Sequence, residues 1–101
     1  MFLDKYLNDT KLFLLSTIYK EEYINNLDYN KFIKIYNLFK EYNFYFIDDI
    51  ILDYLEIFQM DYDEVKKGII FLKEKLGAEF VYIIGSDMRY LEFIQKENTS
   101  I

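Results

Sequence analysis

The sequence predicts a mainly α fold, a compact single-domain helical bundle of four to five helices spanning residues 1–101. The chain has no proline and only three glycines, so few residues interrupt a helix or force a sharp turn. Apolar residues make up 52% of the chain and aromatic residues 21%, too many for a disordered protein. These residues recur at helical spacing along most of the chain. A chain of this length can bury a core without disulfides, and it has no cysteine to form one.

The first helix is predicted to follow a short helical lead-in over residues 1–7. Asp9 and Thr10 are both good N-caps. The broad apolar stripe that begins after them continues to Ile24. The pattern therefore predicts one helix between these N-caps and Ile24.

The second helix is predicted over residues 29–42, with Asp28 as its N-cap. Its apolar residues recur at intervals of three, one and three residues, which is typical of a buried helix face. Asn43 is suited to end this helix, because asparagine tolerates the left-handed conformation better than most residues. The apolar link over residues 44–46 is expected to lie in the core.

A third helix is predicted over residues 47–58, and a fourth from Tyr62 to Leu76, ended by Gly77. Asp61 to Glu64 resembles a capping box at the start of the fourth helix. Gly68 lies inside this helix, where glycine costs about 1 kcal/mol relative to alanine, so we expect a second helix to cross closely there. The residues expected in the core are Phe32, Ile35, Phe39, Ile50, Tyr54, Phe58, Ile69 and Leu72.

The sequence leaves two interpretations open for the secondary structure of residues 79–94. Residues 79–84 are rich in β-branched and aromatic residues, which predicts a strand and a short C-terminal β-hairpin with residues 88–94. Alternatively, Ser86 or Asp87 caps a fifth helix. Residues 96–101 are expected to fray.

One segment, residues 47–64, contains seven acidic residues and no basic residue. The rest of the chain is almost neutral, so the net charge of −6 arises in this segment. If residues 47–58 form one helix, its carboxylates lie on one side and its apolar residues on the other. No lysine follows Asp49, Asp53 or Glu56 at i+4, the spacing at which such charges often pair. The candidate partner-binding residues are Asp48, Asp49, Asp53, Glu56, Asp61, Asp63 and Glu64.

Two interpretations of these carboxylates stay open. Acidic helix faces are usually solvated surface. Alternatively, this face binds the basic surface of a protein partner, which would make the chain a small, non-enzymatic binding or inhibitor-type protein. Proteins whose basic groove holds nucleic acid belong to that class of partner, because a carboxylate can occupy a position shaped for phosphate. An acidic chain is itself repelled by phosphate, which disfavours direct binding to nucleic acid.

A winged-helix DNA-binding regulator is the alternative function. The third and fourth helices and a C-terminal hairpin would match the outline of that fold. The fourth helix would then be the recognition helix, with Lys66, Lys67, Lys73 and Lys75, and Arg89 would lie on the wing. The acidic residues at the start of that helix count against it, since they would face phosphates.

The sequence predicts no catalytic residue, metal site or cofactor. Histidine and cysteine are absent, and no nucleophile, phosphate loop or cofactor motif is visible. Asp61-Tyr62-Asp63 begins like a calcium loop, but Lys66 stands where that loop requires glycine.

The expected location is the cytoplasm, with no membrane association. No apolar run approaches the roughly 20 residues of a membrane span, and no signal peptide is visible. The surplus of tyrosine and phenylalanine, residues favoured at interfaces, is compatible with self-association.

Overall fold

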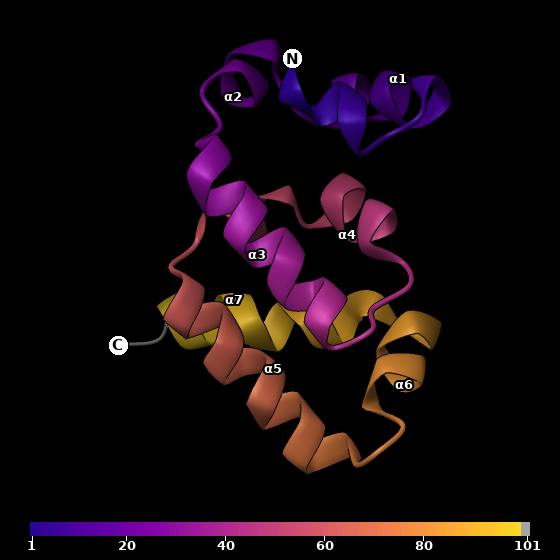
Figure 1. Cartoon of the computed structure of the whole chain (residues 1–101), viewed down its shortest axis with the longest axis vertical. Helices are drawn as coiled ribbons and strands as arrows, with labels where there is room; N and C mark the ends of the chain where they lie inside the picture. Colours follow the sequence, from indigo (N-terminus) through magenta and orange to yellow (C-terminus); the bar gives the residue numbers. More distant parts are fainter. Residues whose placement is uncertain (100–101) are drawn as a thin grey trace.

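The computed structural model describes the backbone of residues 1–99 and the side chains of residues 1–95. Within this range the chain forms seven α-helices and three short 3-10 helices, without any strand (Figure 1). The α-helices are α1 (Asp9–Ile18), α2 (Glu21–Asn25), α3 (Tyr29–Glu41), α4 (Ile47–Asp53), α5 (Tyr62–Leu76), α6 (Phe80–Ser86) and α7 (Glu92–Thr99). The 3-10 helices are η1 (Phe2–Lys5), η2 (Leu55–Gln59) and η3 (Met88–Leu91).

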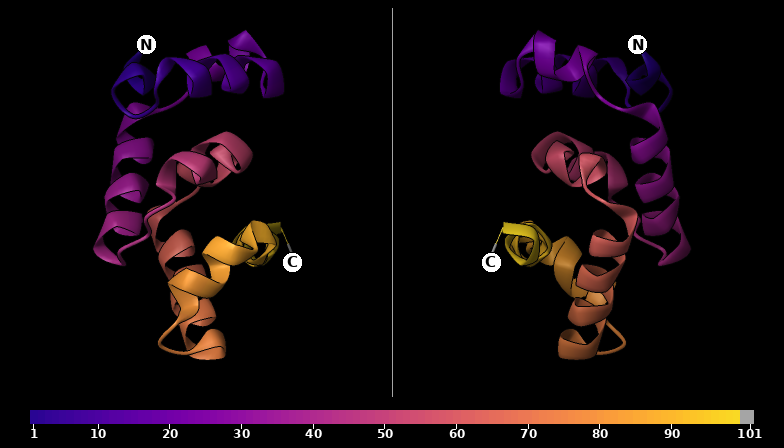
Figure 2. Two further views of the ribbon diagram at one scale, coloured as in Figure 1. Left: turned by 90° about the vertical axis from the view of Figure 1, so that its right-hand side faces the viewer. Right: turned by 90° about the vertical axis from the view of Figure 1, so that its left-hand side faces the viewer.

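The helices are arranged in levels along the longest axis of the molecule. The helices α1 and α2 lie at the N-terminal end, α4 lies at a middle level, and α6 and α7 lie toward the other end (Figure 2). The two longest helices, α3 and α5, run along the molecule and connect these levels. The principal extents are 36 × 29 × 21 Å, so a single core can lie between the helices.

The core is entirely apolar among the described residues, and aromatic rings occupy its centre. The ring centre of Phe58 lies 5.0 Å from that of Phe32 and 5.6 Å from that of Phe39. The predicted core is confirmed except at Tyr54, which is only partly buried. The fully or almost fully buried residues of that set are Phe32, Ile35, Phe39, Ile50, Phe58, Ile69 and Leu72.

Helix α3 begins and ends as the sequence predicts. The Asp28 carboxylate accepts a hydrogen bond from a backbone N–H in the first turn (3.1 Å). At the other end Asn43 adopts a left-handed conformation with φ of 64°, and the Phe44 N–H donates to the Phe39 carbonyl (3.1 Å). The rings of Phe39 and Phe44 are in contact, with centres 4.9 Å apart. This is a Schellman ending, and it turns the chain back into the core.

The prediction of one helix reaching Ile24 is wrong, because α1 ends at Ile18 and a separate helix, α2, follows. Tyr19, the C-cap, is extended, and its hydroxyl accepts a hydrogen bond from the backbone N–H of Leu55 (3.1 Å). The N-cap also differs from the prediction: Asn8 accepts from the Lys11 N–H (2.8 Å).

The predicted helix over residues 47–58 is also broken. Helix α4 ends at Asp53, Tyr54 leaves helical geometry with ψ of 45°, and η2 follows. In an unbroken helix the Leu55 N–H would bond the carbonyl four residues earlier; here it donates to Tyr19 instead. A tertiary hydrogen bond thus links the ends of the two shorter helices, α1 and α4.

The C-terminal β-hairpin is not present in the described residues, so that prediction is wrong and the helical alternative is correct. In α6, Phe80 and Ile84 lie one helical turn apart and are both buried, which favours a helix at this position. Asp87 then caps η3 by accepting from the Arg89 N–H (3.1 Å). Helix α7 continues to Thr99, past the predicted start of fraying; residues 100–101 of that tail lie outside the described residues.

Helix α5 confirms two predictions about glycine. Gly77, with φ of 83°, ends the helix. Gly68 is buried where α7 crosses, and a Cβ placed there would lie 2.6 Å from Cγ1 of Ile94. That separation is too short for any side chain, so the close crossing requires glycine. The predicted capping box does not form: Asp61 is the N-cap, but its side chain makes no capping hydrogen bond.

The order helix, 3-10 helix, helix occurs twice, as α4–η2–α5 and α6–η3–α7. The offset from Ile47 to Phe80, which begin α4 and α6, equals the offset from Tyr29 to Tyr62, which begin α3 and α5. The sequence alone does not predict this repetition. Such units bury their apolar faces against one another, as stacked helical repeats do.

Candidate functional site

The seven candidate carboxylates do not share one helix face. They fall into two groups, separated by the end of η2 at Gln59. We call Asp48, Asp49, Asp53 and Glu56, on α4 and η2, the α4–η2 group. Asp61, Asp63 and Glu64, at the start of α5, form the α5 group. The acidic face predicted on one helix over residues 47–58 thus lies on two elements, α4 and η2.

Lys11 of α1 compensates the first part of the α4–η2 group. Its Nζ pairs with the Asp48 carboxylate and lies 3.6 Å from Oδ1 of Asp49. The hydrogen bond to Asp48 raises the pKa of Lys11, which keeps this lysine protonated. Sequence reasoning found no lysine at i+4 and missed this one, because it comes from another helix. The two aspartates and the lysine together carry a formal charge of only −1.

Two donors from distant segments hold the Glu56 carboxylate in place. The Tyr19 hydroxyl donates to Oε2 (3.0 Å) and the Gln95 amide donates to Oε1 (2.8 Å). Burial, together with the nearby Glu56 charge, raises the pKa of Tyr19, so its hydroxyl keeps its proton and remains a donor. Glu56 is itself exposed. Its charge faces solvent in a defined position, without a cation beside it among the described residues.

Asp53 is the least constrained member of the α4–η2 group. It is exposed and makes no hydrogen bond or ion pair with the residues that the structure describes. It follows Asp49 by one helical turn, and like charges at that spacing repel by a few tenths of a kcal/mol. Asp53 and Glu56 together are the uncompensated charges of this group.

The position of the α5 group at the start of a helix explains why acidic residues occur there. Asp63 and Glu64 lie in the first turn of α5, where the helix dipole stabilises negative charge. Asp61 lines a small hollow together with Lys31 and Lys34 of α3. Asp63 and Glu64 therefore fit a role in the helix start better than a role in binding.

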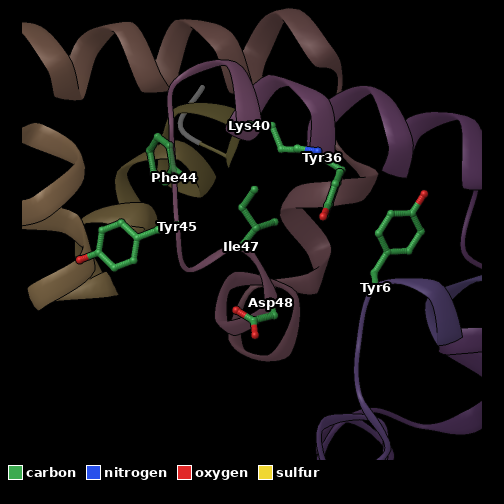
Figure 3. A pocket seen from close by; sticks show the side chains of 7 residues that line it. All are labelled: Tyr6, Tyr36, Lys40, Phe44, Tyr45, Ile47 and Asp48. Atoms are coloured by element: carbon green, nitrogen blue, oxygen red, sulfur yellow. The ribbon is translucent and has the colours of Figure 1, made fainter.

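A hollow of about 380 Å³ lies where α3, the 44–46 link and the start of α4 meet η1 (Figure 3). Its sides are aromatic, and the centres of the Tyr6 and Tyr36 rings are 4.7 Å apart. The Lys40 ammonium lies 5.8 Å from the centre of the Tyr36 ring. A hydrogen bond with Tyr29 raises the pKa of Tyr6 to about 12, so its hydroxyl remains neutral. The lining residues are Tyr6, Tyr36, Lys40, Phe44, Tyr45, Ile47 and Asp48.

This hollow escaped sequence analysis, because separate segments supply its lining. Asp48 is the only candidate site residue that lines it, and Lys11 already pairs with that carboxylate. The remaining polar groups are tyrosine hydroxyls and one lysine. They offer hydrogen bonds and ring faces to a small ligand, but the lining contains no nucleophile paired with a base.

The outline on which the winged-helix interpretation rests is absent from the described residues. Residues 79–94 form α6, η3 and the start of α7, so no hairpin wing is available. Arg89, placed on that wing by the sequence, instead donates two hydrogen bonds to Asp87 (2.9 and 2.7 Å). This contact lowers the pKa of Asp87 to about 2. The guanidinium charge is thus already paired.

The residues that the structure describes show two further features. No helix among them combines the length and the apolar character needed to cross a membrane. They also contain no group of three or more carboxylates close enough to hold a metal ion. No protein-family model, curated protein or solved structure matches this chain.

Proposed function

We propose that this chain is a non-enzymatic binding protein that presents the α4–η2 group to a basic surface of a protein partner. The observation that supports this proposal is the arrangement of Asp53 and Glu56. Both are exposed and lack a cation among the described residues, and Glu56 is held by Tyr19 and Gln95. A carboxylate held in a fixed position loses less side-chain entropy when a partner binds.

The α5 group is not needed for this function. Asp63 and Glu64 stabilise the start of α5, and Asp61 lines a hollow with two lysines of α3. The proposed interface therefore contains fewer residues than the sequence predicts: Asp49, Asp53 and Glu56, with Asp48 holding Lys11 in place. Partners of this chemistry include proteins whose basic groove binds nucleic acid, where these carboxylates would occupy phosphate positions.

A capture experiment with matched variants tests this proposal. The site variant Asp49→Asn, Asp53→Asn, Glu56→Gln removes three charges from the α4–η2 group. The control variant Asp61→Asn, Asp63→Asn, Glu64→Gln removes three charges from the α5 group. We expect the wild type and the control to retain, from host extract at low salt, a basic protein that the site variant loses.

The outcome decides between the two groups because both variants change the net charge by the same amount. If the site variant and the control variant lose the same proteins, the chain acts only through its overall charge. If the site variant retains every protein that the wild type binds, the α4–η2 group is solvated surface and the proposal fails. Mass spectrometry identifies the retained proteins in each case.

A further inference from the structure

Helix α1 exposes apolar side chains on the side that faces away from the core. Phe13 is 68% exposed, Ile18 53% and Leu14 43%, whereas only Leu15 of this helix is fully buried. Helix α4 packs against the inner side of α1. Lys11, near the start of α1, contacts Asp48 of α4, and Tyr19, just after the end of α1, contacts Leu55. A helix that is apolar on its solvent side as well as its core side usually meets another protein surface there.

Most of the exposed side of α1 is uncharged, and Asp9 in the first turn is its one charged residue. With 3.6 residues per turn, Ile18, Leu14, Thr10, Thr17 and Phe13 span an arc of roughly 140° around the helix, and none of them carries a charge. We call these five residues the α1 arc. The Thr17 hydroxyl donates to the Leu14 carbonyl of its own helix (2.7 Å). Covering the arc therefore leaves this hydroxyl paired and removes no ionic group from water.

We propose that the α1 arc binds the α1 arc of a second copy of this chain, forming a two-fold symmetric dimer. The charge distribution favours this occupant over a partner chosen by charge. A basic partner would find no carboxylate on the arc, and an acidic partner would find no cation. A second copy presents an equally uncharged arc, so two chains of net charge −6 can meet through the arc without a charged residue in the contact itself.

The internal packing of the chain shows how such a contact is built. Helix α4 lies along the inner side of α1 and runs parallel to it, as the contacts at both ends show. A second α1 would cover the outer side by the same helix-on-helix packing. Two-fold symmetry requires a patch that is complementary to itself, and an uncharged apolar arc meets that requirement.

The size of the arc sets the expected strength of the dimer. A helix of 10 residues is about 15 Å long, so a pair of such helices buries less than the roughly 1,200 Å² at the lower limit of standard interfaces. We therefore expect a weak, reversible dimer that dissociates on dilution. This dimer does not depend on the proposed acidic interface, because none of the five arc residues belongs to the α4–η2 group.

Sedimentation velocity over a range from low micromolar to near-millimolar concentration tests the dimer. The weight-average mass of the wild type should rise from the monomer value of 12.4 kDa toward twice that value. Phe13→Ser should keep the mass at the monomer value throughout. Tyr82→Ser is the matched control, because Tyr82 on α6 is 66% exposed, and it should dimerise like the wild type. Circular dichroism of both variants checks that the helices are retained.

Cross-linking locates the contact. Because the chain has no cysteine, Thr17→Cys places a single thiol on the α1 arc. Mild oxidation should convert Thr17→Cys, but not Tyr82→Cys, to a disulfide-linked dimer. A wild type that stays monomeric at the highest concentration overturns the proposal, even if the arc binds a different protein. Equal weakening by Phe13→Ser and Tyr82→Ser, or equal cross-linking of the two cysteine variants, overturns it as well.

Discussion

Helices α1 and α4 lie side by side, yet their outward sides differ in charge and in exposed apolar side chains. The α1 arc carries exposed apolar side chains and no charge, whereas the outward side of α4 and η2 bears carboxylates. Charges attract a partner over roughly 8–10 Å at physiological salt, whereas apolar surfaces act only on contact. The comparison shows that the α4–η2 group and the α1 arc are two separate surfaces on neighbouring helices.

Two contacts between these helices hold both surfaces in place. Lys11 pairs with Asp48 near the start of the helices, and the Tyr19 hydroxyl bonds Leu55 and Glu56 just beyond their ends. The buried side chain of Leu15 lies on the inward side of α1, and those of Ile50 and Ile51 belong to α4. Variants that disturb the inner side should therefore affect folding, and variants on the outer sides should affect association alone.

The largest expected effect is on the shared inner side. Ile50→Ala removes a fully buried side chain and should lower the free energy of unfolding by about 2–5 kcal/mol. Leu14→Ala, on the outer side of α1, should lower it by less than about 1 kcal/mol. Urea unfolding followed by circular dichroism measures both. Similar losses for the two variants would mean that α1 and α4 do not have distinct inner and outer sides.

The next effect concerns the contact at the helix ends. Tyr19→Phe leaves the N–H of the buried Leu55 without its acceptor and should cost about 1–3 kcal/mol of unfolding free energy. Tyr23, whose ring stacks on that of Tyr19 at 5.5 Å, provides the control. Tyr23→Phe should have little effect, because the structure shows no hydrogen bond from its hydroxyl to the described residues. If the two variants lose equal stability, the Tyr19 hydroxyl does not join the helices.

The same hydroxyl should make stability depend on pH in the alkaline range. Burial and the charge of Glu56 raise the pKa of Tyr19 above its ordinary value, which is about 10. The folded chain therefore binds this proton more tightly than the unfolded chain. The contribution to stability is complete below about pH 10 and declines as the pH rises through the range between the two pKa values.

Unfolding free energies measured from neutral to strongly alkaline pH test this dependence. Other tyrosines also have raised pKa values, so the relevant quantity is the difference between the wild type and Tyr19→Phe. That difference should shrink above about pH 10. A difference that stays constant at all pH values would show that Tyr19 does not titrate differently in the folded and unfolded chains.

The smallest expected effect on stability is on the outer side of α4. The site variant Asp49→Asn, Asp53→Asn, Glu56→Gln should change the unfolding free energy by no more than about 1 kcal/mol. Relief of repulsion between Asp49 and Asp53 offsets the weaker hydrogen bonds at Glu56. Thermal unfolding at low salt measures the change. A loss as large as that of Ile50→Ala would make these carboxylates part of the fold rather than a surface.

The sequence predicts those elements whose signals are local. Helix α3 has an aspartate N-cap and the left-handed Asn43, and both act as expected. Gly77 and Gly68 likewise indicate an end and a close crossing of α5. At these positions a single residue type determines the backbone conformation or the space available, so no knowledge of distant contacts is required.

The missed features depend on residues far apart in the chain. The breaks after Ile18 and Asp53 are linked through Tyr19 and Leu55, and no local pattern reveals that pairing. The strand prediction over residues 79–84 relied on β-branched content, but the burial of Phe80 and Ile84 on one side of α6 favours a helix. Glu56 leaves the predicted helix for the same reason, since that helix ends at Asp53 and Glu56 lies on η2.

The separation of the two surfaces is tested most directly by association rates at low and high salt. The captured partner is mixed with the wild type, with the site variant and with Phe13→Ser. We expect the site variant at Asp49, Asp53 and Glu56 to associate more slowly than the wild type at low salt. That difference should narrow at high salt, because charges outside a buried contact act mainly on the association rate. Phe13→Ser, on the α1 arc, should associate as the wild type does. An unchanged rate for the site variant at low salt, or an equal loss in Phe13→Ser, would contradict the separation of the two surfaces.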